Sequence, residues 1–228
     1  MFSGLDHAVM QFAGSFAGRS RLFDDFIVKF LDLYAVKLLP MMALLVFLWF
    51  RTARRKESRQ TVVVAIAAML VAVAISRAVQ DLSPHRLRPL HSGDPAFVTP
   101  YGLDPSTLEH WSSFPSDHAA VVFALSTAIF ALSRRLGLIA YVWSIVIVCL
   151  PRLYGGYHYA SDSLGGAMIG IVAALVVMYL LPTRSITERA SGVEARYPGL
   201  FNAGLFMLMY FFATMFEEVR HAVSYLLL

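Results

Sequence analysis

The chain has 228 residues, of which 58% are apolar and 15% are charged, and its formal net charge is +4. Soluble globular domains carry close to a quarter of charged residues, so this composition excludes an ordinary soluble enzyme, a coiled coil and a disordered chain. The apolar residues fall into long runs rather than into a period of 2.0 or 3.6. These features predict an all-α integral membrane protein that crosses the bilayer several times.

The first residues lack the basic start of a cleavable signal, and their apolar side chains recur at helical spacing from Leu5 to Phe16. This pattern predicts a short N-terminal helix in the membrane interface. A spanning helix needs about 20 apolar residues. Six segments meet or approach that length, namely 27–50, 61–79, 118–132 (longer if it begins at Pro115), 136–150, 163–181 and 201–216. We expect one domain over residues 1–228, built as a six-transmembrane-helix bundle, in which Gly166 and Gly170 allow close helix packing.

The basic residues predict the orientation of these spans. Ten of the 19 Lys and Arg residues lie in three short connections, 51–60, 133–135 and 182–198. Positively charged short loops stay on the cytoplasmic side. In a bacterial cytoplasmic (inner) membrane, the loops 80–114 and 151–162 then face the periplasmic or extracellular side. The first of these two loops is long enough to indicate a functional role.

Three short segments on that face carry polar residues that an apolar bundle does not need. Each has a structural explanation by itself. Interfacial arginines contact lipid head groups, Ser116 caps a helix, and Asp162 holds His158 one helical turn away. The segments lie at the ends of successive spans, so we expect them to meet. They are residues 85–89 (HRLRP), 114–118 (FPSDH) and 152–162 (RLYGGYHYASD).

Brought together, these segments have the chemistry of a phosphate site. Guanidinium groups match phosphate oxygens, and a helix N-terminus or a flexible glycine backbone can add N–H donors. Histidine can attack phosphorus or carry a proton near neutral pH. The expected anion-binding residues are Arg86, Arg88, Arg152, Ser116, Gly155 and Gly156, and the expected catalytic residues are His118, His158 and Asp162.

The three segments resemble the signatures of the phosphatidic acid phosphatase type 2 superfamily, which are Lys-x6-Arg-Pro, Pro-Ser-Gly-His and Ser-Arg-x5-His-x3-Asp. The matching core covers roughly residues 77–182. Three positions depart from the signatures: Asp81 stands where the lysine is expected, Asp117 replaces the glycine, and Pro151 replaces the serine. The form with Asp117 and without the lysine is similar to the bacterial branch that dephosphorylates undecaprenyl diphosphate.

The resemblance implies a role for each matching residue. His158 is then the nucleophile that forms a phosphohistidine, Asp162 supports it, and His118 is the general acid and base. Arg88 and Arg152 clamp the phosphate with Ser116 and the Gly155–Gly156 amides. Arg86 takes over part of the work of the missing lysine. The scheme needs no metal and no cofactor.

The implied function is hydrolysis of a lipid-linked phosphate or diphosphate, most simply undecaprenyl diphosphate to undecaprenyl phosphate, which serves peptidoglycan and the cell envelope. The expected partners are a phosphorylated membrane lipid and bilayer lipids, and no nucleic acid. Four alternatives stay open. They are a phosphatase for phosphatidylglycerol phosphate, phosphatidate or lipid A phosphate, a lipid phosphotransferase, a metal hydrolase with His118, His158 and Asp162 as ligands, and a lipid transporter or inactive relative.

The predicted orientation can be tested by labelling. A single cysteine introduced in the 90–110 loop, on a Cys149→Ala background, should react with an impermeant thiol reagent in intact cells. The reason is that the charge bias puts this loop outside the cytoplasm. Labelling that occurs only after the membrane is broken open would reverse the orientation.

Overall fold

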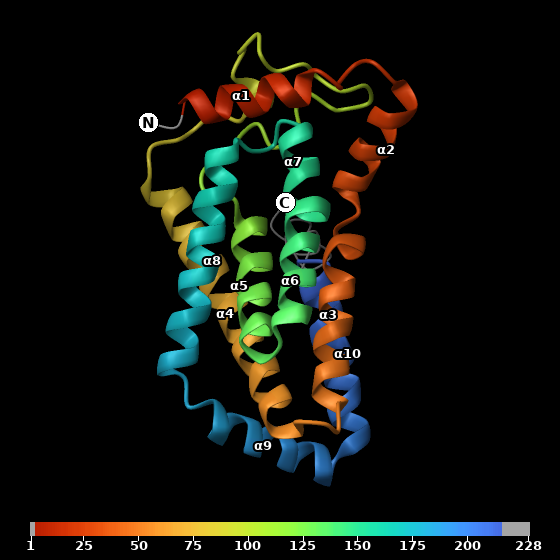
Figure 1. Ribbon diagram of the computed structural model, residues 1–228, viewed down its shortest axis with the longest axis vertical. Helices are drawn as coiled ribbons and strands as arrows, with labels where there is room; N and C mark the ends of the chain where they lie inside the picture. Colours follow the sequence, from red (N-terminus) through yellow and green to blue (C-terminus); the bar gives the residue numbers. More distant parts are fainter. Residues whose placement is uncertain (1–2, 216–228) are drawn as a thin grey trace, which may run out of the picture. The chain divides into compact units, whose positions relative to one another are not determined.

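The computed structural model of the chain describes residues 3–215, and every regular element among them is a helix (Figure 1). The all-α expectation is therefore confirmed for this part of the chain. The described residues form two compact units. The first unit contains residues 3–32 and 65–179, and the second contains residues 33–64 and 180–215. That the whole chain is one domain stays a prediction.

The first unit contains most of the helices. They are α1 (Ser3–Gly14), α2 (Arg21–Asp32), the 3₁₀ turn η1 (Pro89–His91), α5 (Asp117–Leu132), α6 (Arg134–Trp143), the π-helical turn η2 (Ser144–Cys149), α7 (Leu150–Tyr154) and nearly all of α8 (Ala160–Leu180). The second unit contains α3 (Tyr34–Phe50), α9 (Thr183–Arg196) and α10 (Pro198–Ala213). The long helix α4 (Arg55–Leu82) belongs partly to each unit.

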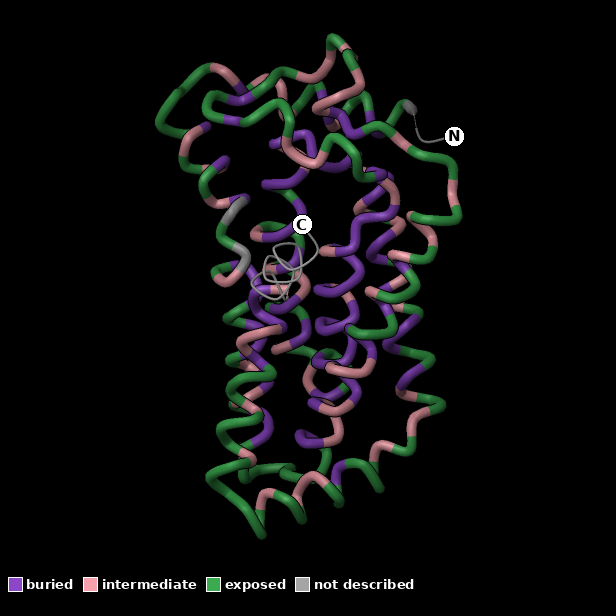
Figure 2. The backbone as a smooth tube through the Cα atoms, turned by 180° about the vertical axis from the view of Figure 1, so that it is seen from behind, coloured by how far each residue is buried: buried purple, intermediate pink, exposed green. Residues whose placement is uncertain are grey.

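Helix α5 forms the centre of the first unit. It begins at Asp117, and the hydroxyl oxygen of the preceding residue, Ser116, accepts a hydrogen bond from the Ala119 amide and caps the first turn. Twelve of its 16 residues are buried, and most of these are alanine, valine or isoleucine. In Figure 2 buried and exposed residues alternate along most helices, as expected where one face packs inside. Small side chains around α5 let neighbouring helices approach its backbone closely.

The closest of these approaches is made by α8. A Cβ atom placed on Gly166 would lie 2.2 Å from the Ser116 carbonyl oxygen, and one on Gly170 would lie 2.2 Å from the Ala120 carbonyl oxygen. Real Cβ atoms do not come so near to a backbone oxygen, so only glycine fits at both positions. The expectation that these two glycines allow close helix packing is confirmed.

The expected span 136–150 is longer in the structure. Helices α6 and α7 and the turn between them run without a break from Arg134 to Tyr154. Consequently Arg152 lies in the last turn of α7, and the expected loop 151–162 shrinks to residues 155–159 before α8 begins. The π-helical turn η2 is held against α5, because the Ser144 hydroxyl of η2 lies 3.0 Å from the Ser126 hydroxyl of α5.

Two other boundaries differ from the sequence expectation. The expected helix 27–50 is broken at Leu33, whose ψ of 73° is not helical, so the chain forms α2 and α3 instead. The polar connection 182–198 contains the 14-residue helix α9 rather than a loop. The sequence did not indicate α9 because its residues are mostly polar. A helix that is exposed on most sides needs only a narrow apolar stripe, so apolar residues recur too rarely to show a helical period.

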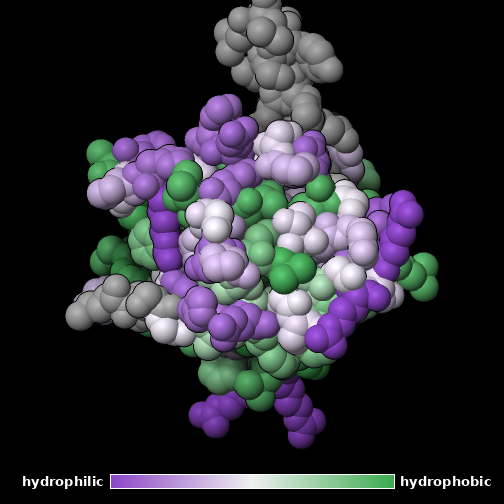
Figure 3. Space-filling model, turned by 90° about the horizontal axis from the view of Figure 1, so that it is seen from above, coloured by the Kyte–Doolittle hydropathy of each residue, from purple (hydrophilic) through white to green (hydrophobic). Residues whose placement is uncertain are grey.

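Helix α1 lies across the ends of α7 and α8 (Figure 1). Its Asp6 side chain is buried and accepts hydrogen bonds from the amide and the hydroxyl of Ser161, at the start of α8. Leu5 and Phe12 are exposed, which suits an apolar face turned toward lipid. Seen from above, hydrophilic and hydrophobic side chains share one face, with many hydrophilic ones toward its rim (Figure 3). An interfacial position for α1 stays a prediction.

The structure supports fewer spans than the sequence predicts. Three helical stretches are long and apolar enough to cross a membrane, Arg55–Leu82, Arg134–Tyr154 and Ala160–Leu180, and α2 with α3 can form a fourth as a bent pair. Helices α5 and α10 are apolar but have only 16 residues each. Residue 216, the last of the expected sixth span, lies outside the described residues. The protein is a helical membrane protein, and the count of six spans stays a prediction.

Replacing Gly170 with alanine should lower stability. The new Cβ would collide with the backbone of α5, and overpacking of this kind costs about 1–3 kcal/mol. The matched control is Gly192→Ala in α9, where a Cβ meets nothing within 4 Å and the better helix propensity is worth roughly 1 kcal/mol. Thermal unfolding of the purified protein in detergent measures both. An equal or higher midpoint for Gly170→Ala would contradict the close packing.

Candidate active site

The three polar segments meet at one carboxylate in the first unit. Asp162 is completely buried and is the second residue after the start of α8. Its two oxygens accept hydrogen bonds from Arg86, from the Ser113 hydroxyl and from the Tyr159 amide at 2.7 Å. Its backbone carbonyl accepts a hydrogen bond of 3.1 Å from the Ser116 amide. The expectation that residues 85–89, 114–118 and 152–162 come together is therefore confirmed.

His158 lies beside this carboxylate, just before α8, and is 4% exposed. Its Nδ1 is 3.8 Å from an Asp162 oxygen and 2.9 Å from the Ser113 carbonyl oxygen. A carbonyl oxygen only accepts hydrogen bonds, so Nδ1 carries the proton and the lone pair is on Nε2. The sequence predicted that Asp162 holds this ring directly. Asp162 does lie beside Nδ1, and the backbone of Ser113 makes the nearer contact, which sets the tautomer.

The second histidine belongs to a separate chain of contacts. Nδ1 of His118 is 2.8 Å from one oxygen of Asp117, and the other oxygen of Asp117 is 2.7 Å from the Arg77 guanidinium. Arg77 also lies over the Trp111 ring, with its Cζ 4.9 Å from the ring centroid. Asp117 therefore connects a cation of α4 to the imidazole of α5. This carboxylate stands at the position where the family signature has glycine.

Two further arginines, Arg88 and Arg152, are buried. Arg88 is 5% exposed and donates hydrogen bonds to the carbonyl oxygens of Trp111, Ser112 and Tyr157. These bonds hold the backbone on both sides of the site. Arg152, in α7, is 3% exposed and near enough to Arg88 for the two charges to act on each other. Burial lowers the pKa of Arg88 to about 10, while Asp117 and Asp162 oppose the shift, so the group is charged at neutral pH.

Arg86, which is expected to take over part of the work of the missing lysine, already has several protein partners. Its guanidinium donates to Asp162, to Asp6 of α1 and to the Ser161 hydroxyl, and lies 4.2 Å from the Tyr159 ring centroid. Two carboxylates compete with any phosphate for this cation. A cavity of about 480 Å³ opens beside it, lined among others by Asp6, Asp94 and Tyr159.

The expectation that Gly155 and Gly156 offer amides to an anion is wrong in this structure. The Gly155 amide donates to the Pro151 carbonyl oxygen at 2.9 Å, and the Gly156 amide donates to that of Leu153 at 3.2 Å. They end α7, whose last carbonyl groups need donors. Gly156 has a φ of +66° and its α-carbon faces the Phe97 ring, which a Cβ would approach to 2.4 Å. These glycines therefore shape the turn that leads to His158.

Sequence reasoning missed three residues that the site uses. Ser113 and Asp6 have no signal, because isolated serines and acidic residues are common at helix ends. Arg77 had one. It stands four residues before Asp81, on the same face of α4 and one turn away, so a cation is present near the place of the missing lysine. Asp81 itself is exposed.

The metal-hydrolase alternative required His118, His158 and Asp162 to share one ion. Within residues 3–215, no group of three or more His, Cys, Asp or Glu side chains is arranged to hold a metal. In both histidines Nδ1 already has a protein oxygen as partner. Whether the chemistry is independent of metal stays a prediction.

Comparison with known proteins agrees with these motifs. Residues 83–186 match the PAP2 superfamily. The chain is 29% identical over 149 residues to the bacitracin transport permease protein BcrC of Bacillus licheniformis, covering 64% of this chain and 66% of that protein. It is 30% identical over 142 residues to the putative undecaprenyl-diphosphatase YbjG of Escherichia coli (strain K12), covering 61% and 65%. It is 26% identical over 152 residues to the undecaprenyl-diphosphatase BcrC of Bacillus subtilis (strain 168), covering 65% and 70%.

The fold has a counterpart among solved structures. The crystal structure of Aquifex aeolicus LpxE superposes with a TM-score of 0.51 and 23% identity, covering 75% of this chain and 93% of that chain. The helical arrangement is thus shared, and at this identity the likeness concerns the fold alone. The chain spans just under two thirds of the first two relatives. The match of residues 83–186 to the PAP2 superfamily confirms the resemblance seen in the motifs.

The buried position of His158 predicts a pH effect on stability. Burial lowers the pKa of His158, Asp162 opposes the shift, and the Arg88 charge adds to it. As pH falls through about 6.5, an unfolded histidine takes up a proton that the folded site resists, so stability falls. The stability of the wild type relative to His158→Gln should therefore decrease between neutral and mildly acidic pH. Thermal unfolding at several pH values measures this, and a relative gain by the wild type would mean a raised pKa.

Proposed function

We propose that the chain is a membrane lipid phosphatase that hydrolyses undecaprenyl diphosphate to undecaprenyl phosphate and phosphate. The match to the PAP2 superfamily and the names of two relatives support this activity and this substrate. The observation that carries the proposal is the state of His158. Its Nδ1 donates to the Ser113 carbonyl oxygen, so Nε2 is a neutral nucleophile among buried arginines.

In the proposed reaction, the Nε2 lone pair of His158 attacks the terminal phosphorus. A phosphorus–nitrogen bond forms and the bond to the leaving lipid phosphate breaks. The ring becomes positively charged, and the completely buried carboxylate of Asp162, 3.8 Å from Nδ1, stabilises that charge. Water then attacks the phosphohistidine and regenerates neutral His158, with release of phosphate.

His118 moves the protons in this scheme. Its Nδ1 lies 2.8 Å from Asp117, so Nε2 is the atom that can give a proton to the leaving oxygen and later take one from water. The ion pair between Asp117 and Arg77 holds the carboxylate in place. The family signature has a glycine at position 117 and a lysine at position 81. Here the added carboxylate and Arg77 form a pair.

In this scheme the arginines neutralise the charge of the phosphate oxygens. Phosphoryl transfer depends mainly on positioning and on stabilising charge on the phosphate oxygens. Arg88 uses three of its five N–H groups on backbone carbonyls and keeps two for a phosphate. Arg152 supplies a second buried cation. Because Arg86 is paired with Asp6 and Asp162, we assign it to positioning the Asp162 carboxylate rather than to the distal phosphate.

The proposed location is a bacterial cytoplasmic membrane, with the site facing the periplasmic or extracellular side. The charge bias of the connections supports this orientation, since ten of the 19 basic residues lie in the three connections assigned to the cytoplasm. A lipid diphosphate on that side presents its charged group at the membrane surface. The site residues precede or begin α5 and α8, at the ends of apolar helices.

One relative carries the name of a transport permease, so transport is the second candidate. An enzyme releases phosphate in detergent, where no compartments exist, whereas a transporter has no measurable activity there. The purified protein should release phosphate from undecaprenyl diphosphate in the presence of EDTA, and faster than from phosphatidylglycerol phosphate, phosphatidate or lipid A phosphate. No release from any of these by folded protein would remove the phosphatase proposal.

Replacing the two histidines should lower turnover to different extents. His158→Ala should abolish turnover, because no phosphohistidine can form. His118→Ala should slow turnover by about 10²–10⁴-fold, the usual contribution of an acid–base group, and less for a phosphate ester whose leaving group needs no proton. Phosphate release and trapping of labelled phosphoenzyme after rapid quenching measure both effects.

The control for these variants is His85→Ala, which removes an exposed histidine next to Arg86 and should keep wild-type turnover. Thermal unfolding of each variant separates chemical loss from misfolding. Wild-type turnover by folded His158→Ala would overturn the nucleophile assignment. Equal losses for good and poor leaving groups would overturn the acid role of His118.

A further inference from the structure

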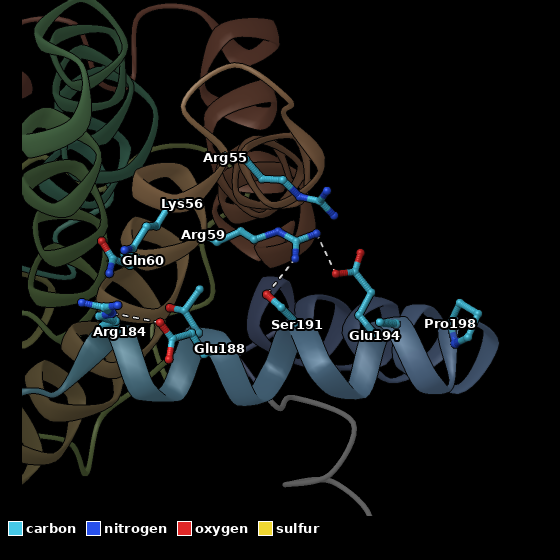
Figure 4. Close-up of a pocket in the computed structure, with 11 residues that line it drawn as sticks. Arg55, Lys56, Arg59, Gln60, Arg184, Glu188, Ser191, Glu194 and Pro198 are labelled. Atoms are coloured by element: carbon cyan, nitrogen blue, oxygen red, sulfur yellow. Dashed lines mark hydrogen bonds and ion pairs between the residues drawn. The ribbon is translucent and has the colours of Figure 1, made fainter.

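A second polar cavity lies in the second unit and has no part in the proposed chemistry. Its volume is about 770 Å³, within the usual range of ligand sites. Both walls come from this unit, one from the first two turns of α4 and the other from α9 (Figure 4). The lining includes four cationic side chains and two carboxylates. They are Arg55, Lys56, Arg59, Arg184, Glu188 and Glu194.

The two carboxylates already have partners, which leaves an excess of positive charge. Nη2 of Arg59 is 2.6 Å from a carboxylate oxygen of Glu194, and its Nη1 donates to the Ser191 hydroxyl at 2.7 Å. Its Cζ lies 4.7 Å from the centroid of the Trp49 ring. Arg184 is 2.9 Å from Glu188. Figure 4 shows these contacts bridging the cavity and lying along α9, with Arg55 and Lys56 projecting from α4 without a marked partner. Arg59 therefore holds the cavity together, and the other two cations of α4 face it.

The first turn of α4 favours an anion, and its one acidic residue, Glu57, offsets only part of the positive charge of Arg55 and Lys56. They occupy the first turn of a 28-residue helix, where the helix dipole repels cations and attracts anions. The amides of a first helical turn also lack partners within the helix. An anionic group in the cavity would neutralise both effects at once.

A polar atom in the cavity wall points to the same ligand. Thr187 is 5% exposed and lines the cavity, and its hydroxyl has no hydrogen-bond partner among the residues that the structure describes. A buried hydroxyl without a partner costs free energy, so such groups are rare in native proteins. A phosphate oxygen would accept this donor together with those of Lys56 and Arg55.

We propose that this cavity is a binding site for a phosphate group, supplied by the head group of an anionic phospholipid or by soluble phosphate. Guanidinium, ammonium and hydroxyl donors on two facing helices are the set that phosphate oxygens need. The two connections that form the cavity are those that the charge bias assigns to the cytoplasm. The site is therefore distinct from the one that contains His118 and His158.

The test uses the full-length protein in nanodiscs. In one arm the discs contain phosphatidylcholine with added phosphatidylglycerol, and native mass spectrometry counts the phosphatidylglycerol retained. In the other arm the discs contain phosphatidylcholine alone, and calorimetry measures binding of inorganic phosphate. Retention in the first arm identifies a lipid head group, and binding in the second identifies soluble phosphate. Neither retention nor binding would overturn the proposal.

The variant Arg55→Gln/Lys56→Gln should weaken whichever ligand binds by at least about 10-fold, the value of one charged hydrogen bond. The matched control, Arg134→Gln/Arg135→Gln, removes two exposed cations from the third basic connection and none from the cavity. It should bind as the wild type does. Equal weakening in both variants would mean general attraction to the charge of the protein, and would overturn the site.

Thr187→Val keeps every charge and nearly the same shape, so it tests the site even if the double variant does not fold. It removes one neutral donor and should weaken binding by about 2- to 10-fold. Wild-type affinity in folded Thr187→Val would overturn the assignment of this cavity, because the buried hydroxyl would then have no part in binding.

Discussion

The first unit of the protein depends on one buried charge. A carboxylate removed from water is costly unless hydrogen bonds and a counter-charge replace its hydration. Asp162 obtains these from three places in the sequence: the guanidinium of Arg86, the hydroxyl of Ser113 and the amide of Tyr159. The segments that supply them are thereby held together. The same Ser113 offers its carbonyl oxygen to His158, so satisfying the carboxylate also fixes the imidazole.

Close backbone approach is the second condition on which this arrangement rests. The Ser116 amide reaches the Asp162 carbonyl oxygen only because α8 comes against the start of α5 at Gly166. A side chain there would separate the two helix ends and stretch the network around Asp162. From the other direction, α1 holds the start of α8 through Asp6, which binds both Ser161 and Arg86. A helix that carries no family motif thus supports the motif residues.

The departures from the family signatures compensate one another. At position 81 a carboxylate replaces the expected lysine, but it is exposed. One turn earlier on α4, Arg77 supplies a cation, and it is paired with Asp117, the residue that replaces the signature glycine. The added acid and the shifted base therefore form one ion pair. Its carboxylate contacts His118, so the altered motif keeps a hydrogen-bonded imidazole.

The sequence by itself determined the all-α membrane class, the Ser116 cap, the tight packing at Gly166 and Gly170, and the meeting of the three motifs. The class, the cap and the glycine packing follow from composition or from spacing within a few residues, where helix geometry fixes what lies near. The meeting of the motifs follows from their place at the ends of successive spans on one predicted face. Only the tertiary structure decided that Arg86 pairs with Asp6 and Asp162, and that Arg77 pairs with Asp117. It also decided that the Gly155 and Gly156 amides donate hydrogen bonds to carbonyl groups of α7. The break at Leu33 was also decided there. For Arg86 and Arg77 the partner lies far away in the chain. For the two glycines several nearby groups compete for the same amides. In both situations the spacing of the residues does not tell which contact forms.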